Sequence, residues 1–298
     1  MDGSTKDSTA RSIRASRYEH GALAQLLRWY SYYEEPKVPV ENLLDLLDEN
    51  VYMKMSAGEA RGRQAFLAAN AEVPRLEWKN AHQIDQVEFT AGPEDAPTHL
   101  RLETEYANTG TDPTGALRSA RLAYDVGLAY DPMSPLPRIT SLVTTPLTPG
   151  RATEVVDCYA TNRVRSLVHY WLALTESPHL GVEPFTEILA PNFHLGFPPG
   201  PIDSLDAFAS WLAGPASSVA AARHEIVSFN VTPTGSSTSD ETTALNAEFH
   251  CDWQGLLADG TEMAATTHHT WSVLDDPTWR FAKIAEVTVA IVRPFRNV

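Results

Sequence analysis

The sequence is poor in cysteine and has no long apolar run. Its 298 residues include two cysteines, Cys158 and Cys251, which are too few for the disulfide framework of a small secreted domain. We therefore expect a reducing, cytoplasmic location. No apolar run approaches the ~20 residues of a membrane-spanning helix, and the polar N-terminus lacks the apolar segment of a signal peptide. We expect residues 1–15 to form a flexible tail.

An excess of basic residues is also missing. The formal net charge is −15, with 15 basic and 21 acidic residues in positions 1–150, and 8 and 17 in positions 151–298. Neither half offers the positive surface that nucleic acid or an anionic membrane would require. The sequence has no glycine-rich phosphate loop, which disfavours a polyphosphate ligand. The expected partner is a neutral or apolar small molecule, or another protein.

Motifs for nucleophilic and metal chemistry are missing too. The sequence has no G-x-S-x-G, and neither cysteine has an activating charged neighbour that its spacing identifies. The segment TTHHTW, from Thr266 to Trp271, invites a metal site, but neighbouring residues of a strand point to opposite faces. We place His269 on the apolar face with Trp271, and His268 on the other face. Without HxH or HExxH spacing, we expect no metal and no other cofactor.

The sequence does contain an internal repeat with an offset of 142 residues. AHQIDQVEF, from Ala81, and ARHEIVSF, from Ala222, place His82 and His224 at matching positions, since 224 − 82 = 142. A period of this length indicates a duplicated domain rather than a solenoid. The same offset joins further identical residues: Trp29 and Trp171, Glu34 and Glu176, Leu47 and Leu189, Asn50 and Asn192, Phe66 and Phe208, Ile84 and Ile226, and Arg138 and Arg280.

The seam between the copies lies in TPLTPGRA, Thr145 to Ala152, where two prolines and a glycine end the last strand expected in copy one. We expect a first domain at residues 16–148 and a second at 152–296. Two copies in one chain also predict that the domains pair with each other as a fused pseudo-dimer. Such a chain would be a monomer.

Each copy shows helical spacing first and strand-like segments later. Helices followed by antiparallel strands are typical of an α+β fold, with helices packed on one face of a curved sheet. In copy two, Asp203 stands where a helix N-cap is expected. The expected elements of copy two are helices at 153–176, 182–189 and 204–213, and strands at 193–197, 224–231, 245–253, 263–274 and 279–289. The corresponding helices of copy one are expected at 18–35, 40–48 and 62–71, with a short strand at 51–55.

Three segments resemble the SnoaL-like, or NTF2-like, α+β cone superfamily, and within it scytalone dehydratase and its relatives. HTWSVLDDPTWRFAKI resembles the terminal hairpin of the family. ILAPNFHL is similar to its junction between the second helix and a strand, and RHEIV and AHQID are similar to its histidine segment. The resemblance covers both copies, roughly residues 17–148 and 153–293. It implies two tandem cones, each of three helices on a curved, mostly antiparallel sheet around an apolar pocket.

The resemblance also implies site residues. In the dehydratases an acid and a tyrosine at the end of the first helix meet a strand histidine across the pocket. The histidine falls on His82 and His224, and the helix pair on Tyr33 and Glu34 in copy one. In copy two the same places hold Thr175 and Glu176, so the tyrosine is missing. The pocket tyrosine of the family is also missing, since Met55 and Phe197 stand near its place. These departures argue against scytalone dehydratase activity itself.

A histidine beside a buried carboxylate can take a proton from a substrate, because the carboxylate fixes the tautomer and stabilises the imidazolium. The alternative is that both histidines only satisfy a backbone group near the start of a strand. Recurrence in both copies fits either interpretation, because structural anchors are duplicated equally well. The candidate catalytic residues are His82, His224, Glu34, Glu176, Tyr33 and His269.

Aromatic residues on the apolar faces are candidates for the cavity walls. Glu286 could add an acid facing the cavity, although such a residue more often lies on the solvated face. The candidate substrate-binding residues are Trp29, Tyr124, Trp171, Phe197, Phe249, Trp253, Trp271 and Glu286.

Two functions remain open. The first is a cofactor-independent lyase, isomerase or cyclase that transfers a proton on a hydrophobic polyketide-, terpenoid- or steroid-like molecule. The second is a non-catalytic module that binds a small molecule or another protein as a fused NTF2-like pseudo-dimer. An intermediate possibility is that one copy is active and the other only completes the interface.

Overall fold

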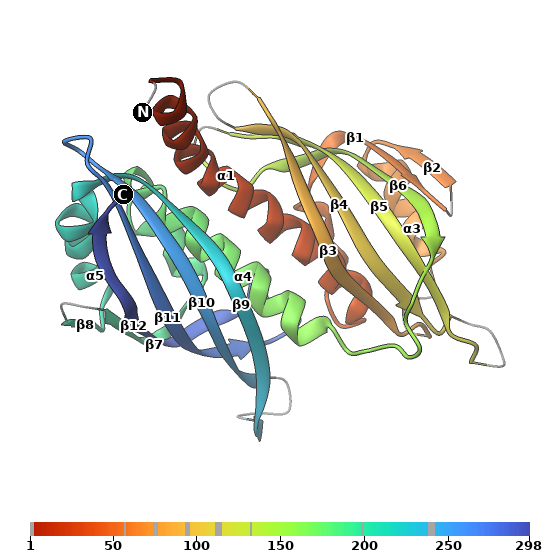
Figure 1. Cartoon of the computed structure of the whole chain (residues 1–298). Helices are drawn as coiled ribbons and strands as arrows, with labels where there is room; N and C mark the ends of the chain where they lie inside the picture. Colours follow the sequence, from red (N-terminus) through yellow and green to blue (C-terminus); the bar gives the residue numbers. More distant parts are fainter. Residues whose placement is uncertain are drawn as a thin grey trace. The chain divides into compact units, whose positions relative to one another are not determined.

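Two six-stranded sheets with the same strand order form the framework of the two copies (Figure 1). The computed structural model describes residues 3–56, 58–73, 75, 77–92, 96–110, 115–131, 133–197, 200–237 and 242–298. The sheet order is β2-β1-β6-β5-β4-β3 in copy one and β8-β7-β12-β11-β10-β9 in copy two. In each sheet the last four strands pair antiparallel in chain order, and the first strand joins the last one in parallel. The repeated order confirms two tandem α+β cones.

Copy one follows the expected sequence of helices and strands, with one strand more than expected. Its elements are α1 (Gly3–Glu34), α2 (Val40–Leu44), β1 (Leu47–Met55), β2 (Gly58–Arg61), α3 (Arg63–Ala71), β3 (Asn80–Ala91), β4 (Pro97–Asn108), β5 (Arg118–Ala129) and β6 (Arg138–Pro149). The helix α1 begins at Gly3, so most of the segment expected as a flexible tail is helical.

Copy two also gains a short strand that the sequence did not predict, and its second helix is a short 3-10 segment. Its elements are α4 (Tyr159–Thr175), η2 (Pro178–Leu180), η3 (Glu183–Glu187), β7 (Leu189–Phe197), β8 (Gly200–Ile202), α5 (Leu205–Ala213), η4 (Pro215–Ser218), β9 (Val219–Ser237), β10 (Thr243–Leu257), β11 (Glu262–Asp275) and β12 (Lys283–Asn297). The N-cap of α5 is Ser204, whose hydroxyl accepts from the backbone N–H of Ala207, rather than Asp203. Asp203 pairs instead with His194.

The aromatic anchors of the repeat lie in the cores, where a helix packs on its own sheet. In copy two, Trp171 of α4 stacks on Phe208 of α5 with ring centroids 5.7 Å apart, and meets Trp271 of β11 edge-on. In copy one, the matching Trp29 contacts the matching Phe66 at 5.7 Å. Buried aromatic side chains at these positions explain why both copies keep the same residues.

The offset of 142 holds through β3 and β9 but not beyond them, which corrects the single offset inferred from the sequence. Tyr106 lies opposite His82, and Trp253 lies opposite His224, so β4 and β10 differ by 253 − 106 = 147. In the next strands, Tyr124 lies opposite Leu102 and His269 opposite Phe249, so the offset is 269 − 124 = 145. The change comes from the different lengths of the hairpins, because β9 and β10 are longer than β3 and β4, and the β4–β5 connection is longer than the β10–β11 connection.

The last strands keep the offset of 145. Ile139 pairs beside Leu47 and Ile284 beside Leu189, and 284 − 139 = 145. Arg138 opens β6, whereas Arg280 precedes β12, so their identity at an offset of 142 is not a structural equivalence.

The chain divides into two compact units whose boundaries cut through α1 and α4. The copy-two domain comprises residues 1–24, 133–135 and 164–298, and the copy-one domain comprises residues 25–132 and 136–163. Each domain thus contains the N-terminal part of the helix that belongs, by sequence, to the other copy. None of the helices within the described ranges is long and apolar enough to cross a membrane.

Candidate active site

In the copy-two domain, Glu176 follows the last residue of α4 and His224 lies near the start of β9. The backbone N–H of His224 donates to Glu176 Oε1 at 2.9 Å, and Nδ1 of the same histidine lies 2.8 Å from that oxygen. A carboxylate oxygen only accepts, so we assign the ring hydrogen to Nδ1. The lone pair of Nε2 is then available to accept a proton.

Burial controls the ionisation of this pair. Burial raises the pKa of Glu176 to about 7, against opposing effects of His20, Ser16, His224 and Arg223. Burial also lowers the pKa of His224 to about 4. Both changes disfavour an ion pair, so burial favours the neutral imidazole and opposes ionisation of the carboxyl group. The proton taken up near neutral pH belongs to the pair as a whole.

The pair borders an apolar cavity of about 510 Å³ inside the copy-two cone. Such a volume suits a small organic molecule, and aromatic rings form much of the wall. The polar groups that face it are few, and they come from Thr175, Glu176, Ser218, His224, Thr267 and His269. The other lining residues are Trp171, Leu172, Phe197, Trp211, Ala216, Val219, Ala221, Ala222, Trp253, Leu257, Met263, Val289 and Phe295.

His269 lies on another wall of this cavity. Its Nε2 is 2.9 Å from the hydroxyl oxygen of Thr267, and its ring stacks on Phe249 with centroids 4.7 Å apart. Burial, together with the neighbouring His224, His268 and His250, lowers the pKa of His269 to about 3. The ring is therefore neutral at physiological pH and can act as a hydrogen-bond partner but not as a cation.

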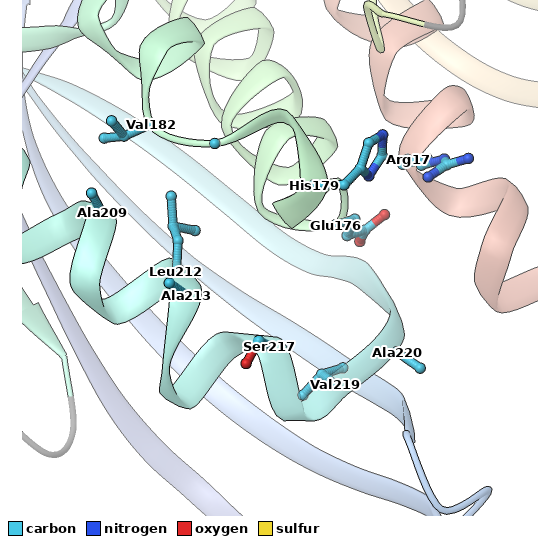
Figure 2. Close-up of a pocket in the computed structure, with 11 residues that line it drawn as sticks. Arg17, Glu176, His179, Val182, Ala209, Leu212, Ala213, Ser217, Val219 and Ala220 are labelled. Carbon is cyan, nitrogen blue, oxygen red and sulfur yellow. The ribbon is translucent and has the colours of Figure 1, made fainter.

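A second hollow of about 450 Å³ adjoins the first, and Glu176 and Val219 line both. Figure 2 shows its other polar residues, with Arg17 of α1 and His179 of η2 on the side of Glu176 and Ser217 farther along. Burial, and then the charge of Arg17, lower the pKa of His179. The carboxyl group of Glu176 therefore lies in a wall shared by the apolar cavity and a more polar hollow.

The copy-one domain holds the same pair with the same bonds. The backbone N–H of His82 donates to Glu34 Oε1 at 2.9 Å, and its Nδ1 lies 3.0 Å from that oxygen. The side chains of Glu34 and His82 are 1% and 5% exposed, so the pair is fully buried.

Aromatic rings cover the copy-one histidine. Tyr30 stacks on His82 with ring centroids 4.4 Å apart and planes 4° from parallel, and Tyr106 packs at 5.0 Å. Tyr124 meets Tyr30 edge-on, and the Tyr30 hydroxyl is 2.9 Å from the hydroxyl of Thr104. These side chains occupy the space next to the His82 imidazole. The matching imidazole of copy two, His224, borders the cavity instead.

Several proposed site residues lie elsewhere than expected. Tyr33 does not reach Glu34, because its hydroxyl donates to Asn70 Oδ1 at 3.1 Å. Glu286 is exposed and does not line the cavity, which corrects its assignment to the cavity face. Irregular register between Ile284 and Glu286 breaks the alternation, so the neighbouring Val287 is buried instead.

The expected aromatic wall residues divide into two groups. Trp171, Phe197 and Trp253 line the cavity directly, whereas Phe249 and Trp271 lie behind them against His269 and Trp171. Two further aromatic residues line the cavity and were not predicted from the sequence, Trp211 of α5 and Phe295 of β12. Phe295 was missed because β12 extends to Asn297, beyond the predicted end of the last strand.

The sequence analysis also missed a polar residue behind each pair. In copy one, the amide of Asn162 donates to both oxygens of Glu34, at 2.9 and 3.0 Å, and to the carbonyl of His82. In copy two, His20 occupies the matching position, since 162 − 20 = 142, and its Nε2 lies 3.0 Å from the carbonyl of His224. The repeat offset relates the two positions, but no local signal places either residue beside its pair. Within the described residues, no cluster of three or more histidine, cysteine, aspartate or glutamate side chains could hold a metal ion.

No family model and no curated protein matches the sequence. Solved structures do match, each over about half of this chain. They include a candidate scytalone dehydratase from Novosphingobium aromaticivorans DSM 12444 (8% identity, 46% of this chain and 87% of the other, TM-score 0.38). An NTF2-like superfamily protein from Salmonella enterica matches at 11% identity over 46% of this chain and 93% of the other, with a TM-score of 0.38.

A third match is the hexachlorocyclohexane dehydrochlorinase LinA-type3 from Novosphingobium barchaimii LL02, at 8% identity over 46% of this chain and 89% of the other, with a TM-score of 0.37. At these identities and TM-scores the matches carry no argument about activity. The fold is assigned from the strand order and register described above.

Proposed function

We propose that the copy-two domain is a cofactor-independent lyase, isomerase or cyclase that transfers a proton on a hydrophobic small molecule. The observation that carries the proposal is the Glu176–His224 pair at the wall of a 510 Å³ apolar cavity. A buried imidazole with a free Nε2 lone pair is suited to remove a proton from carbon or oxygen. The apolar walls suit a polyketide-, terpenoid- or steroid-like skeleton.

In this proposal His224 Nε2 accepts the substrate proton, and the electrons of the broken bond stay on the substrate. The carboxylate of Glu176 stabilises the imidazolium through the Nδ1–H bond. Thr267 and His269, on another wall, offer hydrogen bonds to a substrate oxygen on which negative charge develops. The protonated His224 then returns the proton to another atom of the substrate or to a leaving group.

We propose a structural role for the matching pair of copy one. Its carboxylate ties the end of α1 to the start of β3 through the backbone N–H of His82, and tyrosines cover the imidazole. This arrangement stabilises the fold without offering a substrate access to the ring.

Hydrogen–deuterium exchange of 1-tetralone in D₂O tests the proposal. This apolar bicyclic ketone has acidic C–H bonds next to its carbonyl, and mass spectrometry measures their exchange. We expect the protein to accelerate exchange above the buffer rate, and His224→Ala to remove the acceleration. Equal exchange with the wild type, His224→Ala and buffer would contradict proton transfer on an enolisable ketone.

The second candidate function is non-catalytic binding. The observation that favours it is that Glu176 also accepts the backbone N–H of His224, the same anchoring bond that copy one makes with its covered pair. Binding of the uncharged fluorophore N-phenyl-1-naphthylamine, with no exchange in any enolisable ketone of a panel of bicyclic and steroid skeletons, would favour this function over the first.

A further inference from the structure

Two buried histidines form a pair behind the candidate active site of copy two. His20 comes from α1 and His169 from α4, and both residues belong to the copy-two domain. Their Nδ1 atoms are 2.8 Å apart, and the residues are 6% and 5% exposed. Neither lines the apolar cavity, so neither can touch a substrate there.

The hydrogen-bond partners define the tautomers of both rings. His20 Nε2 lies 3.0 Å from the backbone carbonyl of His224, which only accepts, so this nitrogen carries hydrogen. In a neutral ring, Nδ1 of His20 then has the lone pair, and His169 must donate to it from its own Nδ1. The contact of 2.8 Å therefore requires opposite tautomers in the two rings.

Burial keeps both rings neutral, and the surrounding charges act in both directions. His20 Nε2 is 3.6 Å from Glu176 Oε1, which favours the charged ring, while His224 and Arg223 of β9 oppose it. Burial is the largest influence and lowers the pKa of His20. Burial, His20 and Arg165 of the same helix together lower the pKa of His169.

One more acid faces this region from α1. Burial, and then the nearby Glu176, raise the pKa of Glu19, against an opposing effect of Arg223. The charged and titratable groups around the pair are therefore Glu19, Glu176, His224, Arg165 and Arg223. Glu176 and the backbone carbonyl of His224 favour a proton on His20, whereas the His224 ring and Arg223 oppose it.

We propose that His169 holds His20 as a neutral Nε2–H donor, and that His20 is thereby a positioning residue for the Glu176–His224 pair. The N–H of His20 fixes the backbone carbonyl of His224 and points toward the carboxylate. Because its Nε2 already carries hydrogen, His20 cannot accept a proton from Glu176 unless both rings change tautomer.

This assignment rests on the proposed function only for its catalytic consequence. When His224 takes the substrate proton, the N–H bond forms at Nε2 and the C–H or O–H electrons stay on the substrate. Because His20 cannot accept a proton from Glu176, the proton stays on the Glu176–His224 pair until it returns to the substrate or to a leaving group. The site would therefore retain a proton rather than pass it through the protein interior.

In copy one, other residues stand at the positions that match His20 and His169. The residue that matches His20 is Asn162, and the residue that matches His169 is Leu27, since 169 − 27 = 142. The amide of Asn162 donates to the carbonyl of His82 at 3.1 Å, the bond that His20 makes to His224. The amide also donates directly to Glu34 Oε1 at 2.9 Å, whereas His20 Nε2 lies 3.6 Å from Glu176 Oε1 in copy two.

Long-range nitrogen–proton NMR of the full chain labelled with ¹⁵N-histidine tests the assignment without any substrate. Near pH 7.5 we expect His20 as the Nε2–H tautomer, and His169 and His224 as Nδ1–H tautomers. His20→Asn and His169→Leu assign the signals. An imidazolium at His20, or hydrogen on its Nδ1 rather than its Nε2, would overturn the proposal.

A titration of the His224 signal provides a readout that a merely structural role would not change. In the double variant His20→Asn/His169→Leu, the amide can donate directly to Glu176 and favour the carboxylate. We expect the midpoint of the pair to fall by about one pH unit, whereas His20→Leu should raise it. Unchanged midpoints in both variants, with unchanged melting temperatures, would contradict the positioning role.

The control is the reciprocal change in copy one, Asn162→His/Leu27→His, which should leave the His224 midpoint unchanged. Failure of the NMR test concerns the histidine pair alone. Failure of the exchange assay with correct tautomers would instead contradict the proposed proton transfer.

Discussion

The two glutamate–histidine pairs of this chain make the same bonds in different surroundings. In each copy the glutamate at the end of the long helix accepts the backbone N–H and the Nδ1–H of the strand histidine. In copy two the imidazole borders a 510 Å³ cavity, whereas in copy one Tyr30 and Tyr106 cover it. The shared bonds hold the strand histidine in both copies, and the space in front of the imidazole distinguishes the cavity-lining pair of copy two from the covered pair of copy one.

The largest expected effect comes from removing each histidine in turn. His224→Ala should reduce protein-catalysed exchange of 1-tetralone by at least about 100-fold, the usual contribution of a general base. His82→Ala should leave the exchange rate within about twofold. The same variant should lose about 2–4 kcal/mol of unfolding free energy, because it leaves a void among packed rings.

Chemical denaturation measures the second half of this prediction. His224→Ala should lose less unfolding free energy than His82→Ala, because His224 already borders a cavity. If the His82 variant abolishes exchange while the His224 variant does not, the active and structural copies have been assigned the wrong way round.

Exchanging one residue should interconvert the two environments. Leu172 lines the copy-two cavity and matches Tyr30, since 172 − 30 = 142. Leu172→Tyr should bring a ring over His224 and weaken N-phenyl-1-naphthylamine binding about tenfold or more. Tyr30→Leu should remove the stacked ring from His82 and cost about 2–4 kcal/mol of unfolding free energy. Fluorescence titration and denaturation follow the two changes, and unaltered dye affinity in Leu172→Tyr would argue against the cavity as the binding site.

The pH dependence of the exchange rate should show which copy catalyses the exchange. Under the proposed function, proton acceptance by His224 is assisted by the ionised form of Glu176, whose pKa burial raises to about 7. Exchange in copy two should therefore increase as pH rises through about 7 and then level off. Glu176→Gln should lower the plateau and remove this step, whereas Glu34→Gln should keep it. A wild-type profile that decreases across the same interval would contradict the assignment of the base.

The contributions of Glu176 and His224 to stability should change with pH in opposite directions. A folded-state pKa of Glu176 above its unfolded value means that its contribution to stability is present at low pH and decreases as pH rises from 4.5 to about 7. A lowered pKa of His224 means that stability is lost as pH falls from 6.5 to about 4. Glu176→Gln should remove only the first trend, so its melting temperature relative to wild type should rise between pH 5 and 7.

The smallest effect is expected at the rim of the cavity. Phe295 lines the cavity and is 50% exposed, while Ile291 on the same strand is 43% exposed and does not line it. Phe295→Ala should weaken N-phenyl-1-naphthylamine binding about threefold, as expected for losing part of one apolar contact. Ile291→Ala is the matched control and should leave the dissociation constant unchanged.

The fold and the two pairs followed from the sequence because they depend on local signals. The repeat matched Glu34 with Glu176 and His82 with His224, and the family resemblance paired each glutamate with its histidine. Hydrophobic periodicity predicted helices followed by strands in each copy. A bulge between Ile284 and Glu286 is invisible to strict alternation, so the face of Glu286 was wrong. The different lengths of the hairpins in the two copies likewise hid the equivalence of Tyr124 and His269.

What could not be predicted depends on tertiary packing. The residues Tyr30 and Leu172 differ visibly in the sequence, but whether a ring covers the neighbouring imidazole depends on its rotamer and on the strands opposite. His20 lies on a segment next to the expected tail, and nothing local links it to Glu176 or His169. Such contacts join residues far apart along the chain, so periodicity and composition carry no signal for them.

The most direct measurement follows the histidine signals while N-phenyl-1-naphthylamine is added to the ¹⁵N-histidine-labelled chain. The account predicts that the signals of His224 and His269 shift as the cavity fills, while that of His82 stays in place. Saturable binding of the dye that shifts His82 and leaves His224 and His269 unchanged would contradict it.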